Sequence, residues 1–484
     1  MNEDKKQRFN FHNSYTQLPK LFYSEVEPDK SKKPELVIFN QKLAEETDIE
    51  ADNIDELTQI FAGNIKADNS ESIATAYAGH QFGYFTMLGD GRALLLGEHL
   101  DRDGNRFDIQ LKGSGRTPYS RGGDGKAGLK AMLKEYIYSE ALQGLGIPTS
   151  RSLAVVKTGE QIYRERNEDG AVLCRLMPSF IRVGTFEFAA YYGNKEDLES
   201  LLDYTIQRHF PEIKADANKT LALIEKVMEQ QIHLIVNWMR VGFIHGVMNT
   251  DNTSVCGYSF DYGPCAFMGV YNPDTVFSSI DQNGRYAFGR QAAVLKWNLA
   301  RFAETLLPLI DDDQEKAIEK ATNKINEFDA IFNSEFEEMM LCKIGIYHKE
   351  EGDLALLKEF LELIETHQKD YTHSFNYLRL PDLYKTKDFI LGTEFLDWKE
   401  RWQHRIEKDD KGHSFSLMER YNPLFIPRNY FVEEALNLAV EGEMKKFKTL
   451  IYNLQMPYWY DSEMDDSLFE PAGFDSDFQT TCGT

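Results

Sequence analysis

The carboxylates of Asp251 and Asp261 and the amide of Asn252 lie close together in the segment from residue 245 to residue 263. Asp251 and Asn252 are adjacent, and Asp261 follows nine residues after Asn252. Carboxylate and amide oxygens are the ligands that Mg²⁺ and Mn²⁺ prefer. This spacing suits a strand-turn-strand that brings both groups to one ion, so we predict a metal site at Asn252 and Asp261. The alternative is that these residues only cap turns, as Asp and Asn often do.

The order of residues in this segment is that of a kinase catalytic loop. Kinases place an Asp-containing loop that ends in Asn shortly before a metal-binding Asp-Phe-Gly. Here His245 and Asn252 align with the loop, and Asp261-Tyr-Gly aligns with the metal triad. Val247 stands where the loop usually has its Asp, and a valine cannot accept a proton. Asp251 is the nearest carboxylate that could take this role.

A lysine and a glutamate upstream fit the same pattern. Lys112 follows the strand-like segment FDIQL, and Glu135 lies in the helical segment that comes next. In kinases such a lysine contacts phosphate and is held by a helix glutamate. Glu140 on the same helix is a competitor, because five positions correspond to a rotation of about 140° and the two side chains point in different directions.

Glycines and arginines in the first half of the chain could bind phosphate groups. Gly89 and Gly91 belong to a turn between two apolar runs in YFTMLGDGRALLLGEHL, which predicts a hairpin. Turn glycines let the backbone approach phosphate closely, although most hairpin glycines are only structural. Arginine matches phosphate oxygens with two N–H donors, and surface ion pairs are its other common use. The basic cluster comprises Arg92, Lys112, Arg116, Arg121, Arg175 and Arg182.

The elements that must position these residues change in type along the chain. Short apolar runs between about residues 77 and 190 predict strands and one helix at 126–146, whereas amphipathic helices dominate beyond about residue 195. A long helix at 222–243 leads directly into the metal segment. We predict an α+β, protein-kinase-like two-lobed fold with extensions at both ends. Its parts are an N-terminal extension (1–70), a mostly β, nucleotide-binding N-lobe (71–190), a mostly α C-lobe with the catalytic and metal loops (191–470), and a tail with Cys482 (471–484).

Composition excludes several classes of protein. A formal charge of −24 repels other polyanions, so we expect no nucleic-acid partner. No apolar run approaches the ~20 residues that cross a bilayer, so we expect no membrane partner. Five scattered cysteines do not form a disulfide framework, and the N-terminus lacks the apolar core of a secretion signal. A cytoplasmic location is the expectation.

Taken together, these motifs resemble the selenoprotein O family of kinase-like protein adenylyltransferases. The resemblance covers nearly the whole chain, and several of the motifs are long and unusual. They are FNFHNSY, AYAGHQFGYF, LGDGRA, DIQLKGSGRTPYSRGGDGKA, LKEYIYSEAL, LGIPTSRSLAVV, HGVMNTDN, DYGP, RYAFGRQ and a Cys-x-x terminus.

The resemblance implies a role for each of these residues. Asp251 would be the proton acceptor, Asn252 and Asp261 would hold Mg or Mn, and Glu135 would orient Lys112, which contacts phosphate. The other nucleotide-binding residues would be Gly89, Gly91, Arg92, Asp124, Gly125, Arg175 and Arg182. The family is described as binding ATP in reversed orientation, so that AMP is transferred to a protein hydroxyl; UMP transfer from UTP is also described. Protein substrates with Ser, Thr or Tyr hydroxyls would be the partners.

One departure from the family concerns redox control. Many relatives carry a cysteine in a Phe-x-Cys-Asn-His-Ser-Asp stretch after the DYG segment, but residues 275–281 here read TVFSSID. A disulfide from Cys482 to that position is therefore excluded, and Cys256 and Cys265 are the only nearby substitutes. Two rival functions remain open: γ-phosphoryl transfer to a protein or small molecule, which the missing loop Asp disfavours, and an inactive nucleotide-binding scaffold with a redox tail. The target proteins and the oligomeric state are not predicted.

Overall fold

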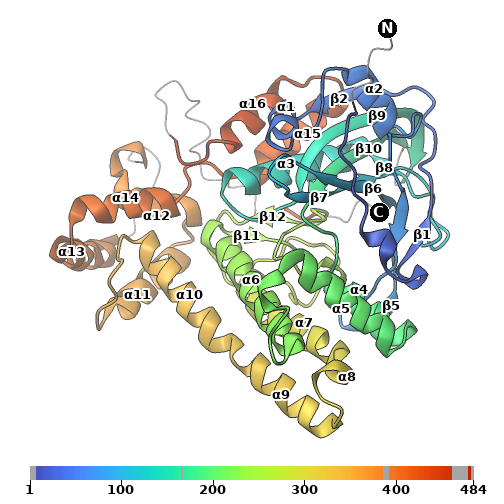
Figure 1. The fold of residues 1–484 in the computed structure, drawn as a ribbon. Coiled ribbons are helices and arrows are strands. Elements are labelled where there is room, and N and C mark those ends of the chain that lie inside the picture. The colour runs from blue at the N-terminus through green and yellow to red at the C-terminus, as the bar shows by residue number, and fades with distance from the viewer. Residues whose placement is uncertain (1–6, 165–166, 385–391, 460–477, 481–484) are drawn as a thin grey trace.

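The computed structural model describes residues 7–164, 167–384, 392–459 and 478–480. A sheet built mostly from the first half of the chain lies beside a larger helical part (Figure 1). The long helix α6 (Lys219–Val241) and the short strands β11 (Phe243–Ile244) and β12 (Ala266–Phe267) lie at the junction of the two parts. This is the predicted α+β fold, with a mostly β part followed by a mostly helical part.

The sheet has eight strands, and every described pairing in it is antiparallel. Two of its strands, β1 and β2, come from the stretch predicted as an N-terminal extension, so this stretch contributes to the sheet itself. The strand order is β1 (Tyr23–Glu25), β3 (Ile73–Thr75), β6 (Ala93–Leu100), β7 (Arg106–Lys112), β10 (Asn167–Met177), β9 (Arg151–Tyr163) and β2 (Glu35–Phe39), with β8 (Ala127–Gly128) paired to β10.

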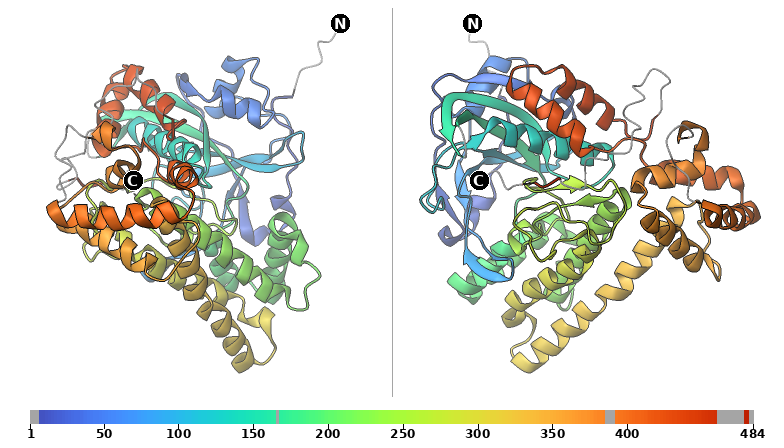
Figure 2. Two further views of the ribbon diagram at one scale, coloured as in Figure 1. Left: turned by 90° about the vertical axis from the view of Figure 1, so that its left-hand side faces the viewer. Right: turned by 180° about the vertical axis from the view of Figure 1, so that it is seen from behind.

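Alternation along β7 separates a core face from a functional face. Ile109 and Leu111 are fully buried in a core that α1 (Gln41–Glu46) and α2 (Ile54–Phe61) help to form. Successive side chains point to opposite faces of a strand, so Gln110 and Lys112 face the other way. On that side lies α3 (Leu129–Gly144), which is covered in turn by α15 (Asn429–Val440) and α16 (Lys445–Leu454), as Figure 2 shows.

The predicted long helix is α6 (Lys219–Val241). The side chain of Asn218 accepts a hydrogen bond from Leu221 N (3.0 Å) and caps its start. Gly242 ends it with φ of 75°, a conformation that glycine adopts without strain. The chain then passes directly into β11 (Phe243–Ile244), which pairs with β12 (Ala266–Phe267). The two strands bracket residues 245–265 and so fix both ends of the predicted metal segment.

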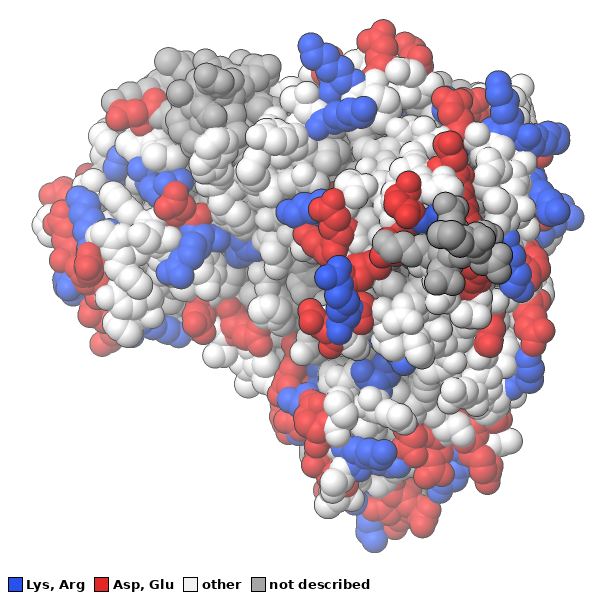
Figure 3. All heavy atoms as spheres, turned by 45° about the horizontal axis from the view of Figure 1, so that its top comes forward, with Lys and Arg blue, Asp and Glu red and all other residues white. Residues whose placement is uncertain are grey.

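The remaining helices form the body of the helical part, and α11–α14 project to one side of it (Figures 1 and 2). Within the described residues, the helices are all too short or too polar to span a bilayer. On the face that Figure 3 shows, Lys and Arg side chains are interspersed with Asp and Glu. The remaining helices of the helical part are α4 (Val183–Tyr192), α5 (Lys195–His209), α7 (Gln291–Thr305), α8 (Leu307–Ile310), α9 (Gln314–Asn326), α10 (Phe328–Lys343), α11 (Asp353–Thr366), α12 (Tyr371–Arg379), α13 (Gly392–Lys408) and α14 (Lys411–Tyr421).

The hairpin predicted around the Gly-Asp-Gly turn is wrong. Strand β5 (Tyr84–Met87) pairs with β4 (Ala78–Gln81) in a separate two-stranded sheet, whereas β6 belongs to the large sheet. The reason is Asp90, whose buried carboxylate accepts hydrogen bonds from Thr75 N (2.9 Å) and Thr75 Oγ1 (2.7 Å). These bonds tie the turn to β3, so the residues before it leave the sheet as the β4–β5 hairpin.

Candidate active site

Lys112 and Glu135 form a buried ion pair between the sheet and α3. Lys112 is the last residue of β7, and its Nζ lies 2.7 Å from Glu135 Oε2. Glu140, the competitor one and a half turns further along α3, binds Arg151 instead, with Nη2 to Oε2 at 2.9 Å. The geometry therefore selects Glu135 as the partner of Lys112.

Arg175 and Asp261 complete a cluster of four charges. Arg175 lies opposite Gln110 in the β7–β10 register, and its Nη1 is 2.5 Å from Glu135 Oε1 and 2.7 Å from Asp261 Oδ1. Lys112 also pairs with Asp261 Oδ1. Burial by itself would raise the pKa of Asp261, but the charges of Arg175 and Lys112 outweigh burial and hold that pKa well below its usual range. Asp261 is therefore a carboxylate at neutral pH.

Gln110 was not predicted from the sequence, yet it fixes the arginine of this cluster. Its Oε1 accepts hydrogen bonds from Arg175 Nε (3.0 Å) and Nη2 (2.6 Å). The signal for it was the period of two along β7, which puts Gln110 on the same face as Lys112.

Arg182 connects the Gly-Asp-Gly turn with the loop at 245–252, which we call the catalytic loop. Its Nη1 donates to the backbone oxygen of Asp251 (3.1 Å), and its Nη2 lies 3.9 Å from Asp90 Oδ1. The guanidinium also lies over the ring of Tyr77, 4.1 Å from its centroid. Asp90 was not predicted as a site residue, although it stands between the two glycines that were.

Asp251 is buried and has one oxygen without a hydrogen-bond partner among the described residues, Oδ1. Burial is the main cause that raises the pKa of this carboxyl to about 6, with a smaller contribution from the charge of Asp261. The strand β4 passes close by, because a Cβ added at Gly79 would lie 2.5 Å from Asp251 Oδ1. A buried acceptor with a free oxygen and a pKa near neutrality has the properties of a general base.

The side-chain oxygens of Asn252 and Asp261 are of the kind that binds a divalent cation. Asn252 Nδ2 donates to Val247 O (2.9 Å), which leaves the amide oxygen as an acceptor, and Asp261 is ionised. No group of three or more His, Cys, Asp or Glu side chains suitable for a metal occurs in the described ranges. Two oxygen ligands suit Mg²⁺, which usually completes its coordination with water and substrate phosphates.

The glycine turn packs against the loop that follows Lys112. A Cβ at Gly89 would lie 2.4 Å from the ring of Tyr119, and one at Gly91 would lie 2.9 Å from Tyr119 O. Gly125 has φ of 70°, and its carbonyl oxygen accepts a hydrogen bond from Gly115 N (3.1 Å). Substitution at Gly89 or Gly91 would force the two loops apart, and a Cβ at Gly125 would lie 1.9 Å from Gly115 O within the second loop. Arg92 lies at the start of β6, where its carbonyl accepts from Gly113 N (2.7 Å).

Among the described residues, no contact joins Asp124 to the charge cluster. Both of its carboxylate oxygens bind Arg164, Oδ2 to Nη1 and Oδ1 to Nη2, each at 2.9 Å. Its role toward the nucleotide stays a prediction.

Thr480, near the C-terminus, contacts the segment 275–281. Ser279 N donates to Thr480 O (3.0 Å), and Thr480 N donates to Phe277 O (2.7 Å). Cys482 itself lies outside the described residues. The cysteines within the described ranges are buried and form no disulfide with one another: Cys174, Cys256, Cys265 and Cys342.

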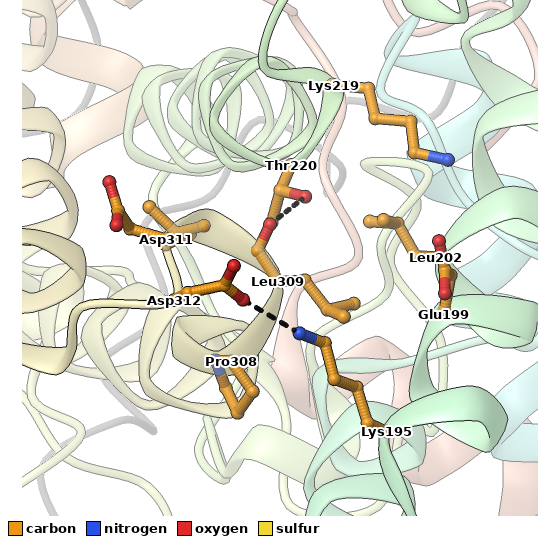
Figure 4. Close-up of a pocket in the computed structure, with 10 residues that line it drawn as sticks. Lys195, Glu199, Leu202, Lys219, Thr220, Pro308, Leu309, Asp311 and Asp312 are labelled. Atoms are coloured by element: carbon orange, nitrogen blue, oxygen red, sulfur yellow. Dashed lines mark hydrogen bonds and ion pairs between the residues drawn. The ribbon is translucent and has the colours of Figure 1, made fainter.

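A cleft of about 280 Å³ lies elsewhere, between α5, α6 and α8 (Figure 4). Lys195 and Asp312 form an ion pair across it (3.3 Å), and Thr220 Oγ1 donates to Leu309 O (3.2 Å). None of its lining residues belongs to the predicted site.

Comparison with known proteins identifies the family. The model of the family described as "Protein adenylyltransferase SelO" matches residues 5–455. Relatives described as "Protein nucleotidyltransferase YdiU" include one from Anoxybacillus flavithermus, 49% identical over 481 residues, which covers 98% of this chain and 99% of the relative. Another, from Pelagibacter ubique, is 48% identical over 481 residues, again with 98% and 99% coverage.

A solved structure, ROP2 from Toxoplasma gondii, described as having a protein-kinase fold and no enzymatic activity, matches at 12% identity. The match covers 69% of this chain and 86% of that chain, but its TM-score of 0.26 is too low to support a conclusion. The family match needs no such support, because it spans almost the whole sequence and agrees with the motifs. The chain therefore belongs to the SelO family of protein adenylyltransferases.

Proposed function

We propose that this adenylyltransferase transfers AMP from ATP to Ser, Thr or Tyr hydroxyls of proteins, with UTP as an alternative donor of UMP. The hydroxyl oxygen attacks the α-phosphorus, and its proton passes to Asp251. The bond from the α-phosphorus to the oxygen that bridges to the β-phosphorus breaks, and pyrophosphate leaves. The observation that carries the proposal is the free, buried Oδ1 of Asp251.

The residues of the charge cluster would act on the phosphates. Lys112 and Arg175 would stabilise the negative charge that develops as pyrophosphate departs, and Glu135 holds both cations in place. The amide oxygen of Asn252 and the carboxylate of Asp261 would hold Mg²⁺ or Mn²⁺. A bound cation would neutralise phosphate charge and orient the nucleotide.

ATP labelled at different phosphates tests this function against its two rivals. Label at the α-position should appear on protein, and label at the γ-position should not. Transfer of the γ-label alone would identify a kinase, and the absence of both labels would identify an inactive nucleotide-binding scaffold. Val247 in place of the usual loop Asp is the residue that argues against the kinase. The intact mass of the labelled protein provides an independent check.

A further inference from the structure

The β4–β5 hairpin is held against the catalytic loop by hydrogen bonds from its first strand and from its turn. His80 N donates to Thr250 Oγ1 (2.7 Å), and Phe82 N donates to Asn249 Oδ1 (3.2 Å). Thr250 and Asn249 are both buried and immediately precede Asp251. The hairpin is therefore anchored to the two residues that lead into the proposed base.

One carboxylate contacts both the β4–β5 hairpin and the catalytic loop. Glu187, a buried residue of α4, accepts from Thr250 Oγ1 at Oε2 (2.6 Å). Its other oxygen, Oε1, lies 2.6 Å from His80 Nδ1. The Thr250 hydroxyl thus accepts from the hairpin and donates to α4 at the same time. Three elements that are far apart in sequence meet at this one hydroxyl.

The network matters because the space around Asp251 is tight. Gly79, next to His80, leaves no room for even a methyl group beside Asp251 Oδ1. Gly184, on the first turn of α4, is equally close to the hairpin, since a Cβ there would lie 2.1 Å from Ala78 O. A small shift of the hairpin would therefore displace the carboxylate, and a displacement of 1 Å can cost about 10²-fold in rate.

We propose that Glu187 is a positioning residue, which fixes the β4–β5 hairpin and the catalytic loop relative to each other through Thr250 and His80. In doing so it holds Asp251 at the acceptor hydroxyl. This inference rests on the proposed role of Asp251.

Two substitutions at Thr250 separate hydrogen bonding from packing. Thr250→Val keeps the shape and removes the hydroxyl, whereas Thr250→Ser keeps the hydroxyl and removes the methyl group. We expect Thr250→Val to transfer AMP about 10²-fold more slowly, with ATP affinity near that of the wild type. Thr250→Ser should keep most of the activity. Thr58→Val, which removes a buried hydroxyl bonded to Ile54 O (2.8 Å) in α2, is the matched control and should transfer at the wild-type rate.

Two substitutions at His80 test the proposal if Thr250→Val does not fold. The His80 side chain is partly exposed, so its replacement is less disruptive. His80→Ala removes the contact to Glu187, and His80→Asn restores a polar group near the position of Nδ1. The rate should fall in the first variant and recover in the second. Equal rates for His80→Ala and wild type, or Thr250→Ser as slow as Thr250→Val, would overturn the proposal.

Amide hydrogen exchange tests the coupling without any activity. In the nucleotide-free protein, Thr250→Val should accelerate exchange in both the hairpin (78–87) and the catalytic loop (245–252). Faster exchange in only one of them, or in neither, would overturn the proposal. Failure of the wild type to transfer the α-label to protein would reject the proposed function, while the exchange result would still decide whether the two segments are coupled.

Discussion

Replacing Asp251 with Asn should make the protein more stable and much less active. The substitution keeps the size of the side chain and removes its charge. If Asp251 is the base, the amide cannot take the proton of the attacking hydroxyl, so transfer should slow by about 10²–10⁴-fold. The affinity for ATP should change little, because Lys112, Arg175 and Asp261 hold one another in a separate cluster.

The gain in stability follows from the cost of keeping this carboxylate ionised. A pKa that rises from 3.8 to about 6 corresponds to about 3 kcal/mol against the ionised form in the folded state. Because the folded pKa is the higher one, this cost is fully present above pH 6 and disappears as the pH falls below 3.8. At pH 8 the Asn variant should therefore be more stable by up to about 3 kcal/mol. Activity and stability would move in opposite directions, as expected for a functional residue under strain.

Urea unfolding at pH 8, measured beside initial rates with α-labelled ATP, tests both parts. Asp274→Asn removes the same charge at an exposed position and should change neither quantity. The wild-type rate should rise with pH through about 6 as Asp251 ionises. If the Asn variant transfers AMP at the wild-type rate, Asp251 is not the base. A variant less stable than wild type would show that the charge of Arg182, which lowers the pKa of Asp251, outweighs the burial of this carboxylate.

Two further predictions concern the charge cluster. Asp261→Ala should abolish both transfer and metal-dependent ATP binding, because alanine supplies no oxygen ligand; calorimetry would detect binding, and retained affinity would place the metal elsewhere. Glu135→Gln should cost about 3–5 kcal/mol of stability and slow transfer, since it weakens the hold on two buried cations. Glu140→Gln is the control, because it weakens only the pair with Arg151. It should destabilise the protein, but the folded fraction should still transfer AMP. Equal losses of transfer in both variants would refute the assignment of Glu135.

Local patterns predicted most of the elements around the site. The helix that carries Glu135, the strand that ends at Lys112 and the long helix before the catalytic loop all appear where periodicity placed them. Periodicity succeeds here because each element buries one continuous face. It did not decide between Glu135 and Glu140, since both are buried and the choice depends on which cation faces each side of α3.

Strand pairing around the Gly-Asp-Gly turn could not be predicted in the same way. The apolar runs on both sides of the turn suit a hairpin, but the bonds from Asp90 to Thr75 join residues 15 positions apart. The turn that does form a hairpin contains Phe82 with φ of 51°, a rare conformation outside glycine, followed by Gly83 with φ of 89°. Contacts between distant segments, such as those of Glu187 with Thr250 and His80, leave no local trace in the sequence.

The geometry of one short turn explains how the base and a metal ligand can be adjacent in sequence without interfering. Residues 250–252 form a single 3₁₀ turn, in which successive side chains point about 120° apart. Asp251 faces Gly79 of the hairpin, whereas Asn252 turns back to the carbonyl of Val247. In a kinase the base lies further from the Asn, at the position that Val247 occupies here. Moving the carboxylate beside the Asn places it against Gly79 of the β4–β5 hairpin instead.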